Sequence, residues 1–355
     1  MWPDRRILDL FAVDHPIVQA PMAGSDSPKL AIAVAEAGGL GSLAAAMLDP
    51  AGLRAALAEF RAGTNRSINL NFFCHTPPLP DDEREARWRE RLAPYRLEFG
   101  LGSAATAAGP ARSPFDATMC ALVEELRPRV VSFHFGLPEA ALLERVRRAG
   151  CAVVSSATTV AEARWLAARG VDAIVAQGAE AGGHRGMFLG DETSAQPGTL
   201  ALVPQIVDAV AVPVIAAGGI ADARGIVAAL ALGAAGVQIG TAYLLTPEAK
   251  TSAVHRAALR SADADATAIT HVFTGRPARG IINRLMRELG PMCADVPAFP
   301  LAAAAVLPLR TAAEARGSGD FSPLWAGQGV ALAREVGAGE LTRALAGQAL
   351  AAFRR

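Results

Sequence analysis

Residues 214–222 read Val-Ile-Ala-Ala-Gly-Gly-Ile-Ala-Asp, a short apolar run that ends in two glycines and leads into a helix-like stretch. Apolar runs of this kind recur along the chain, most of them starting roughly 20–30 residues apart, the length of one βα unit. The stretches between them carry apolar residues at helical spacing, such as Leu53, Leu57 and Phe60. The predicted strands are Ile17–Ala20, Leu40–Ala44, Ile68–Phe73, Val130–Phe135, Ala152–Ser156, Ala173–Gln177, Val214–Ala217 and Val237–Gly240. Eight such units in series predict an α/β protein with a closed (β/α)8 TIM barrel rather than an open doubly wound sheet.

Two segments interrupt this repeat. Residues 74–127 contain a charged helix-like run, Asp81–Arg91, between two expected loops, the proline-rich Thr76–Pro80 and the small-residue stretch Gly100–Pro110. The later segment, Thr246–Gly317, is interpreted as helices broken at Gly275-Arg276-Pro277 and at Pro291–Pro300.

These interruptions suggest a division of the chain. We expect residues 1–245 and 318–355 to form the barrel, with a closing helix within Phe321–Arg355. Residues 246–317 are expected to form a small, mainly helical domain over the C-terminal rim of the barrel, on the substrate side.

Composition excludes several classes of function. The chain has 355 residues, 52% hydrophobic and 19% charged, with a formal net charge of +0 and no basic run, which disfavours nucleic-acid binding. Apolar stretches such as Leu301–Leu307 are too short to span a bilayer, and the first ten residues lack the apolar core of a signal peptide. Four scattered cysteines without a CxxC pair predict neither a zinc site nor disulfides, and a cytoplasmic location is expected.

Four polar residues are predicted to meet at the C-terminal ends of the strands. Alternation along each strand turns Asn71, His134, Gln177 and Gln238 toward the barrel interior. Any one of them could be a hydrogen-bonded core residue, but four at one rim favour a polar ligand. The set contains no carboxylate pair for glycosidase-like chemistry and no metal-ligand spacing. Uncharged amides suit a heteroaromatic ring such as the pyrimidine edge of a flavin.

Glycine-rich loops follow the last two strands. Ala217-Gly218-Gly219 and Gln238-Ile239-Gly240-Thr241 allow backbone N–H groups to approach an anion, and these loops are the usual phosphate site of this fold, although tight βα turns would also explain the glycines. The chain has neither GxxxxGK[ST] nor a GxGxxG after a strand, so a mononucleotide cofactor is expected. The loop Ala20-Pro21-Met22 after the first strand is small and stiff enough to approach a flat ligand.

The loop Glu180–Gly186 places a histidine among glycines. This glycine density predicts a shaped loop, and His184 within it is a candidate for moving a proton; the alternative is a solvated loop histidine. Arg185 could attract an anion or form a surface salt bridge.

Taken in order and spacing, these motifs resemble the nitronate monooxygenase family, formerly called 2-nitropropane dioxygenases. The resemblance extends to Asn69-Leu70-Asn71, to Ser132–Gly136 and to Trp325-Ala326-Gly327-Gln328-Gly329, a stretch typical of the bacterial type. It implies FMN, no metal, and oxidation of alkyl nitronates by O2 to a carbonyl compound and nitrite, and the protein is expected to be a monomer or homodimer. His184 would deprotonate a neutral nitroalkane or hydrogen-bond a nitronate, with His134 as a second polar contact. The implied FMN-binding residues are Ala20, Pro21, Met22, Asn71, Gln177, Gly182, Gly183, Ala217, Gly218, Gly219, Gln238, Ile239, Gly240, Thr241, Trp325 and Gln328.

Three other functions are compatible with parts of this pattern. A flavin-dependent enoyl reductase, which would use NAD(P)H, carries a similar Ala-Gly-Gly-His loop, but Ser132–Gly136 and Trp325–Gly329 favour the nitronate enzyme. A catalytically idle FMN-binding protein and a non-flavin barrel such as a phosphate-sugar isomerase are the others. The apolar run Ala302–Ala305 with Leu307 departs from the polar and aromatic residues of bacterial relatives and predicts a more apolar substrate pocket.

Overall fold

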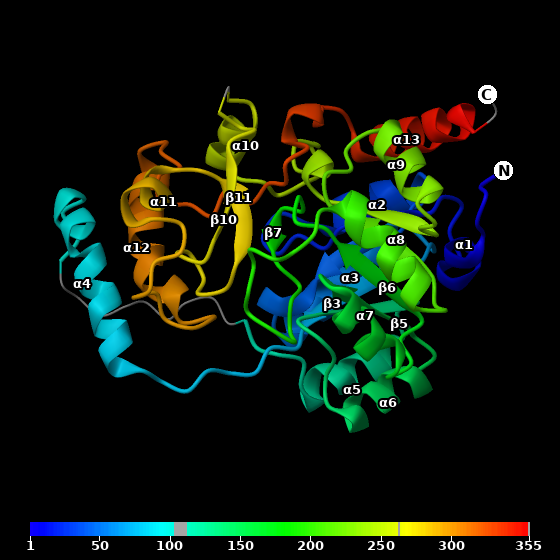
Figure 1. Ribbon diagram of the computed structural model, residues 1–355, viewed down its shortest axis with the longest axis horizontal. Helices are drawn as coiled ribbons and strands as arrows, with labels where there is room; N and C mark the ends of the chain where they lie inside the picture. Colours follow the sequence, from blue (N-terminus) through cyan, green and yellow to red (C-terminus); the bar gives the residue numbers. More distant parts are fainter. Residues whose placement is uncertain (103–111, 262, 354–355) are drawn as a thin grey trace.

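The computed structural model describes residues 1–102, 112–261 and 263–353, and its core is the predicted barrel (Figure 1). Eight parallel strands run in the order β1-β9-β8-β6-β5-β4-β3-β2. A bridge between Val18 and Leu40 joins the two ends of this sheet. The strands are β1 (Ile17–Gln19), β2 (Gly41–Ala44), β3 (Ile68–Phe73), β4 (Val130–His134), β5 (Ala152–Ala157), β6 (Ala173–Gln177), β8 (Val214–Ala217) and β9 (Gly236–Ile239). The predicted strands are confirmed, with shifts of a residue or so at several ends.

Helices surround this sheet. They are α2 (Pro28–Glu36), α3 (Pro50–Gly63), α5 (Ala117–Leu126), α6 (Ala140–Arg148), α7 (Val160–Ala167), α8 (Thr199–Ala209), α9 (Ala223–Ala231) and α13 (Ala338–Ala352), with short 3₁₀ turns at Ala45–Met47, Thr241–Tyr243 and Val330–Leu332. The closing helix predicted near the C-terminus is α13, which packs between α9 and α2. Before β1, helix α1 (Arg6–Phe11) buries Ile7 and Phe11 against the barrel interior.

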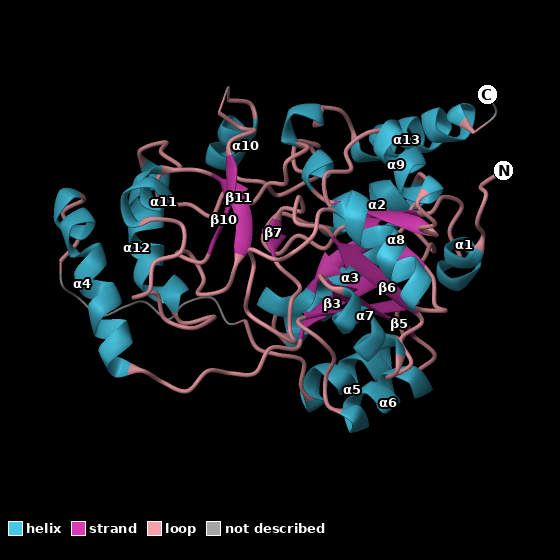
Figure 2. Cartoon of the chain, in the orientation of Figure 1, coloured by secondary structure: helices cyan, strands magenta, loops and turns pink. Residues whose placement is uncertain are grey.

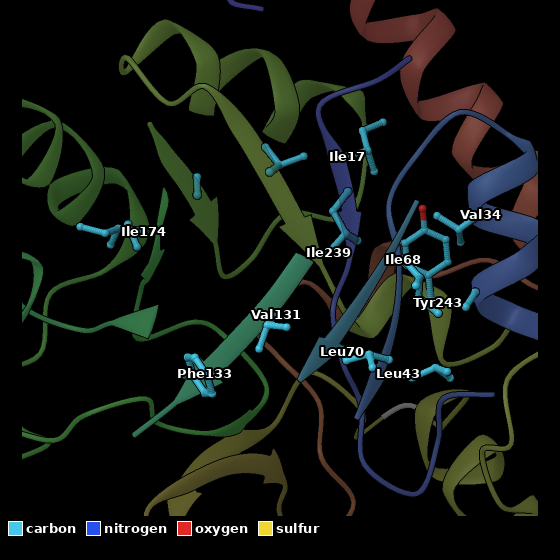
Figure 3. Close-up of a cluster of buried hydrophobic side chains, with 14 of the residues drawn as sticks. Ile17, Val34, Leu43, Ile68, Leu70, Val131, Phe133, Ile174, Ile239 and Tyr243 are labelled. Carbon is cyan, nitrogen blue, oxygen red and sulfur yellow. The ribbon is translucent and has the colours of Figure 1, made fainter. Parts of the chain in front are cut away.

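The strand alternation explains how the barrel is filled. Ile17, Leu70, Val131, Phe133 and Ile239 point outward into the layer shared with the helices, where they form one apolar cluster (Figure 3). Val18, Val154, Val175 and Ala217 point inward. Each fully buried aliphatic side chain of this kind contributes about 1.5–3 kcal/mol to folding. The interior is therefore apolar at these positions, whereas Ser42 and Asn69, which share the inward phase of Asn71, are buried and hydrogen-bonded to each other.

A second unit lies beside the C-terminal rim and contains a sheet that was not predicted (Figure 2). It comprises α4 (Asp82–Glu98), α10 (Ala253–Leu259), α11 (Arg284–Leu289), α12 (Ala302–Ala315) and the antiparallel strands β10 (Thr267–Thr270), β11 (Ala278–Ile281) and β7 (Gly183–His184). The break predicted at Gly275-Arg276-Pro277 is present, but the segments on either side of it, Thr267–Thr270 and Ala278–Ile281, pair as a hairpin instead of forming the expected helices. Its short strands contain β-branched residues, which favour this pairing.

The histidine loop is also more regular than predicted. Gly183 and His184 pair with Arg279 and Ala278 of β11, so this part of the predicted shaped loop is a short edge strand, β7. This pairing joins the loop after β6 to the second unit.

The insertion after β3 packs against the second unit. Its expected helix is α4, and Trp88 on α4 is 1% exposed and donates its indole N–H to the carbonyl of Ala302, 3.3 Å away. Leu92 and Tyr95 join the same apolar cluster. Residues 76–80 form the expected loop, whereas most of the loop expected at 100–110 lies outside the described residues.

Part of the apolar run of α12 is buried inside the second unit. Ala302, Ala305, Val306 and Leu309 are buried in the cluster with α4. Ala302 and Ala305 of the predicted run therefore belong to the core of the second unit, and that Ala303, Ala304 and Leu307 make a substrate pocket more apolar stays a prediction.

Candidate functional site

Polar side chains from adjacent strands meet at the C-terminal rim of the barrel. Asn71 lies opposite Ser132 in the sheet and donates its amide N–H to the Ser132 hydroxyl at 2.9 Å. Gln177 lies opposite Ala217, which in turn lies opposite Gln238. The Gln238 side chain is partly exposed and makes no hydrogen bond with a described residue. Amide groups thus remain available at this rim.

His184 is anchored through its backbone from the barrel. Its carbonyl oxygen accepts hydrogen bonds from Gln177 Nε2 at 3.0 Å and from His134 Nε2 at 3.2 Å. The Gln177 Oε1 atom accepts the N–H of Gly186 at 2.7 Å. The predicted site residues Gln177 and His134 therefore hold the histidine strand in place.

The tautomer of His184 follows from its ring contacts. Its Nε2 lies 3.0 Å from the Thr274 hydroxyl, and that hydroxyl lies 3.3 Å from the carbonyl of Arg276. Because a carbonyl oxygen only accepts, Thr274 donates to Arg276 and accepts the Nε2–H of His184. The Nδ1 atom then carries a lone pair, and it has no hydrogen-bond partner in the part of the chain that the structure describes.

His134 has no free ring nitrogen. Its Nε2 donates to the carbonyl of His184, so its Nδ1 accepts from the Ser156 hydroxyl at 3.0 Å. Burial lowers the pKa of His134 to about 4. The structure therefore favours a positioning role for His134 over the second polar contact in the active site that the resemblance implied.

The surroundings of His184 keep it neutral. Burial lowers its pKa well below the usual value, and the charges of Arg112, His134, Arg276 and His75 lower it further. A neutral imidazole with an open Nδ1 is able to accept a proton, and the nearby guanidinium groups favour a negative charge on whatever lies beside it.

Aromatic rings from distant segments enclose this histidine. The ring centres of Phe299, Trp325, Phe135 and Phe73 lie 5.4, 5.6, 6.0 and 6.2 Å from that of His184. Sequence reasoning identified only Trp325 among them as a site residue. Phe299 lies in Pro291–Pro300, which was interpreted only as a break between helices, so no local pattern assigned it to the site.

The glycine loops come together with the segment around Gly327. A Cβ on Gly182 would lie 2.5 Å from the Gly327 nitrogen, and the Gly327 N–H donates to the Thr241 hydroxyl at 2.9 Å. The N–H of Gln328 donates to Glu180 O at 3.0 Å, and Gly329 packs against Gly219. The predicted residues in the loops after β6, β8 and β9 thus all contact the segment Gly327–Gly329.

The first loop is fixed by a residue that sequence reasoning missed. Gly240 lies close to Ala20 and Met22, which brings the Ala20-Pro21-Met22 turn to the end of β9. Asp26 Oδ2 accepts the N–H groups of Met22 at 3.1 Å and of Ala44 at 2.8 Å. Burial raises the pKa of Asp26 to about 7, against the lowering effect of these bonds and of Lys250. An aspartate in a loop gave no sequence signal of its own.

Arg185 does not form the surface salt bridge that was one of its two predicted roles. It is 0% exposed, which excludes a surface salt bridge, and it donates to the carbonyl of Gln177 and to Gln196 Oε1, each at 2.8 Å. Its guanidinium therefore supports the end of β6 from behind.

Membrane-spanning helices and metal-binding clusters were also sought among the described residues. None of their helices is both long and apolar enough to cross a membrane. Nor do three or more of their His, Cys, Asp or Glu side chains gather where they could bind a metal ion.

Comparison with known proteins agrees with this architecture. The sequence profile of the family described as nitronate monooxygenase matches residues 4–347. A nitronate monooxygenase from Pseudomonas aeruginosa is 44% identical over 342 residues, 96% of this chain and 97% of that protein. Nitroalkane oxidase from Streptomyces ansochromogenes has a structure with a TM-score of 0.90 at 40% identity, covering 98% of this chain and 99% of that one. FabK from Thermotoga maritima has a TM-score of 0.73 at 25% identity over 100% of this chain and 98% of that one. The chain belongs to the nitronate monooxygenase family of flavin-dependent oxidoreductases.

Proposed function

We propose that this enzyme binds FMN and oxidises alkyl nitronates with O2 to a carbonyl compound and nitrite. Two nitronate anions and one O2 balance two carbonyl molecules and two nitrite ions, so no external reductant is required. The observation that supports this most is His184, a neutral histidine whose Nδ1 has no partner among the described residues and whose ring lies among aromatic rings and cationic groups. These surroundings suit a small anion or the carbon acid that forms it.

The residues at the rim fit FMN. Gly218 and Gly219 have φ values of 123° and 68°, and a Cβ on Gly183 would meet no atom within 4 Å, so the backbone beside His184 borders open space. We assign the phosphate to the backbone of Gly219, Gly240 and Thr241 and the ring edge to the amides of Asn71 and Gln238. The other predicted contacts, Ala20, Pro21, Met22, Gly182, Ala217, Ile239, Trp325 and Gln328, belong to the loops around this place. Bound FMN would supply the electron transfer between nitronate and O2.

The protein side of the reaction is assigned to the histidine and its neighbours. With a neutral nitroalkane, His184 Nδ1 accepts the proton from the carbon that bears the nitro group, while Thr274 holds the opposite ring nitrogen. With a preformed nitronate no proton is removed, and the positive charges of Arg112 and Arg276 stabilise the anion. The aromatic rings exclude water from the reacting carbon.

Anaerobic mixing of the FMN-loaded protein with ethyl nitronate, and separately with NADPH, tests the reaction. We expect the nitronate to change the flavin absorbance and, once air is admitted, nitrite to accumulate. Bleaching by NADPH alone would support the enoyl reductase-like alternative. A response to neither compound would indicate an idle flavoprotein, and failure to bind FMN would indicate a non-flavin barrel.

A variant tests the role of the histidine. His184→Asn is expected to retain FMN and to lose about 10²- to 10⁴-fold in kcat with neutral nitroethane, the usual contribution of a general base. His271→Asn is a matched control, because His271 bonds the carbonyl of Cys293 at 2.9 Å in the second unit. Equal turnover by the two variants would show that His184 does not carry the proton.

A further inference from the structure

Three glycines from separate loops surround one pair of side chains, Glu180 and Thr199. A Cβ on Gly178 would lie 2.5 Å from Glu180 Oε2, and one on Gly198 would lie 2.7 Å from Glu180 Oε1. A Cβ on Gly218 would lie 2.6 Å from Thr199 Oγ1. Non-bonded atoms do not approach this closely, so a side chain at any of the three positions would displace the pair. The glycines therefore leave the space that Glu180 and Thr199 occupy.

Glu180 caps the helix that follows the histidine loop. Helix α8 begins after Gly198, which has no side chain with which to cap it. The two Glu180 carboxylate oxygens accept the backbone N–H of Thr199 at 2.9 and 2.8 Å, and Oε2 accepts the Thr199 hydroxyl at 2.8 Å. A negative charge thus lies at the positive end of the α8 dipole. Because the protein itself occupies this anion position, the N-terminus of α8 is closed to a phosphate.

The Thr199 hydroxyl also reaches the loop after β8. Its Oγ1 lies 3.0 Å from the carbonyl oxygen of Gly218, so its single hydrogen is shared between that oxygen and Glu180. The carbonyl of Gly218 and the N–H of Gly219 belong to one trans peptide, in which the two groups point in opposite directions. Holding the carbonyl on Thr199 therefore turns the N–H of Gly219 away from α8.

This peptide depends on such a restraint because it joins two glycines. Gly218 and Gly219 have φ values of 123° and 68°, and without a Cβ on either side the peptide between them can rotate at little steric cost. The hydrogen bond from Thr199 favours one orientation. Thr199, in turn, is held by Glu180 through both its N–H and its hydroxyl.

We propose that Glu180 and Thr199 are positioning residues for the cofactor: they fix the Gly218-Gly219 peptide so that the N–H of Gly219 is presented to the phosphate. The inference rests on the proposed function, which assigns the FMN phosphate to this loop, and adds two residues that act through the backbone. Their loss weakens the binding of FMN much more than that of riboflavin, which has the same ring system but no phosphate. A general disturbance of the fold weakens both flavins alike.

Flavin titration separates these two effects. Dissociation constants of FMN and of riboflavin are measured by flavin fluorescence on protein freed of flavin. Thr199→Val keeps the shape of the side chain but loses its hydroxyl, and should weaken FMN about 3- to 10-fold, the net value of one hydrogen bond, with riboflavin unchanged. Thr199→Ser restores the hydroxyl and should recover most of this affinity. An equal loss of both flavins in Thr199→Val, or no loss of either, would overturn the proposal.

A carboxylate that caps another barrel helix provides the matched control. Asp49 accepts the N–H of Gly52 in the first turn of α3 at 2.7 Å. Asp49→Asn should leave the preference for FMN over riboflavin unchanged, whereas Glu180→Ala should lower it about tenfold or more, because the α8 cap and the support of Thr199 are both lost. Glu180→Gln keeps an acceptor for the Thr199 N–H and should lie in between. A preference as high in Glu180→Ala as in Asp49→Asn contradicts the role of Glu180.

Hydrogen exchange tests the positioning without any flavin. In the flavin-free protein, backbone exchange of residues 214–222 should be faster in Thr199→Val than in Thr199→Ser or in the wild type. Failure of the wild type to bind FMN would refute the proposed function, and faster exchange in Thr199→Val would then still support the restraint on the Gly218-Gly219 peptide. Exchange that is the same in all three proteins would show that the hydroxyl does not hold the loop, whatever the cofactor.

Discussion

Asp26 makes the stability of the cofactor-side loops depend on pH in a direction that can be worked out. One carboxylate oxygen accepts two backbone N–H groups, from Met22 after β1 and from Ala44 at the end of β2. Burial nevertheless raises the pKa of Asp26 from 3.8 to about 7. Between these two values the folded protein retains a proton that the unfolded chain has lost, so its free energy of unfolding falls as the pH rises through this window.

The size of the effect follows from the shift. A difference of about 3 pKa units corresponds to about 4 kcal/mol, and because the residue keeps part of its surface accessible we expect about 2–4 kcal/mol. Asp26→Asn cannot ionise and can still accept both N–H groups through its amide oxygen. Relative to the wild type, the Asn variant should therefore gain about 2–4 kcal/mol between pH 4 and pH 8, with no further gain at higher pH.

Urea unfolding followed by tryptophan fluorescence, at several pH values from about 4 to 8, measures this difference. Taking the difference between the variant and the wild type removes the histidines, which titrate alike in both. The reasoning is refuted if the difference does not change with pH. It is also refuted if the wild type gains on the variant as the pH rises, because that would mean that Lys250 and the two N–H groups hold the carboxylate ionised.

Two further changes test the packing around the site. Gly182→Ala would place a Cβ 2.5 Å from the nitrogen of Gly327, so FMN affinity measured by fluorescence titration should fall by about tenfold or more, whereas Gly347→Ala, with no atom within 4 Å, should leave it unchanged. Trp88→Ala should cost about 3–5 kcal/mol of local stability and speed amide exchange in α12, unlike Arg89→Ala on the exposed face of α4; unaltered exchange would show that α4 does not support α12.

The barrel and its rim could be predicted because alternation along a strand is a local property. Asn71, His134, Gln177 and Gln238 were assigned to the interior from their neighbours alone, and the sheet register places them there. What each side chain bonds to could not be predicted in the same way. The partners of His134 are Ser156 and the backbone of His184, 22 and 50 residues away in sequence.

The second unit was predicted less well because its order depends on contacts between distant segments. The apolar run of α12 was predicted to line a substrate pocket. In the structure α4, more than 200 residues earlier in the sequence, packs against part of it through Trp88. The hairpin at 267–281 was not predicted because its strands are short. Its third strand, β7, comes from the distant loop after β6. Arg112 and Phe299 likewise gave no signal, because neither lies in a recognisable motif.

The position of His184 at the junction of the two units has a consequence for specificity. Its backbone carbonyl is held from the barrel by Gln177 and His134, while its ring is held from the second unit by Thr274. The loops assigned to FMN belong mostly to the barrel, whereas Phe299 and Thr274 belong to the second unit. Substitutions in the second unit can therefore alter which substrate reaches the histidine without altering the cofactor loops. This separation allows residues on the second-unit side of His184 to change while the loops assigned to FMN stay the same.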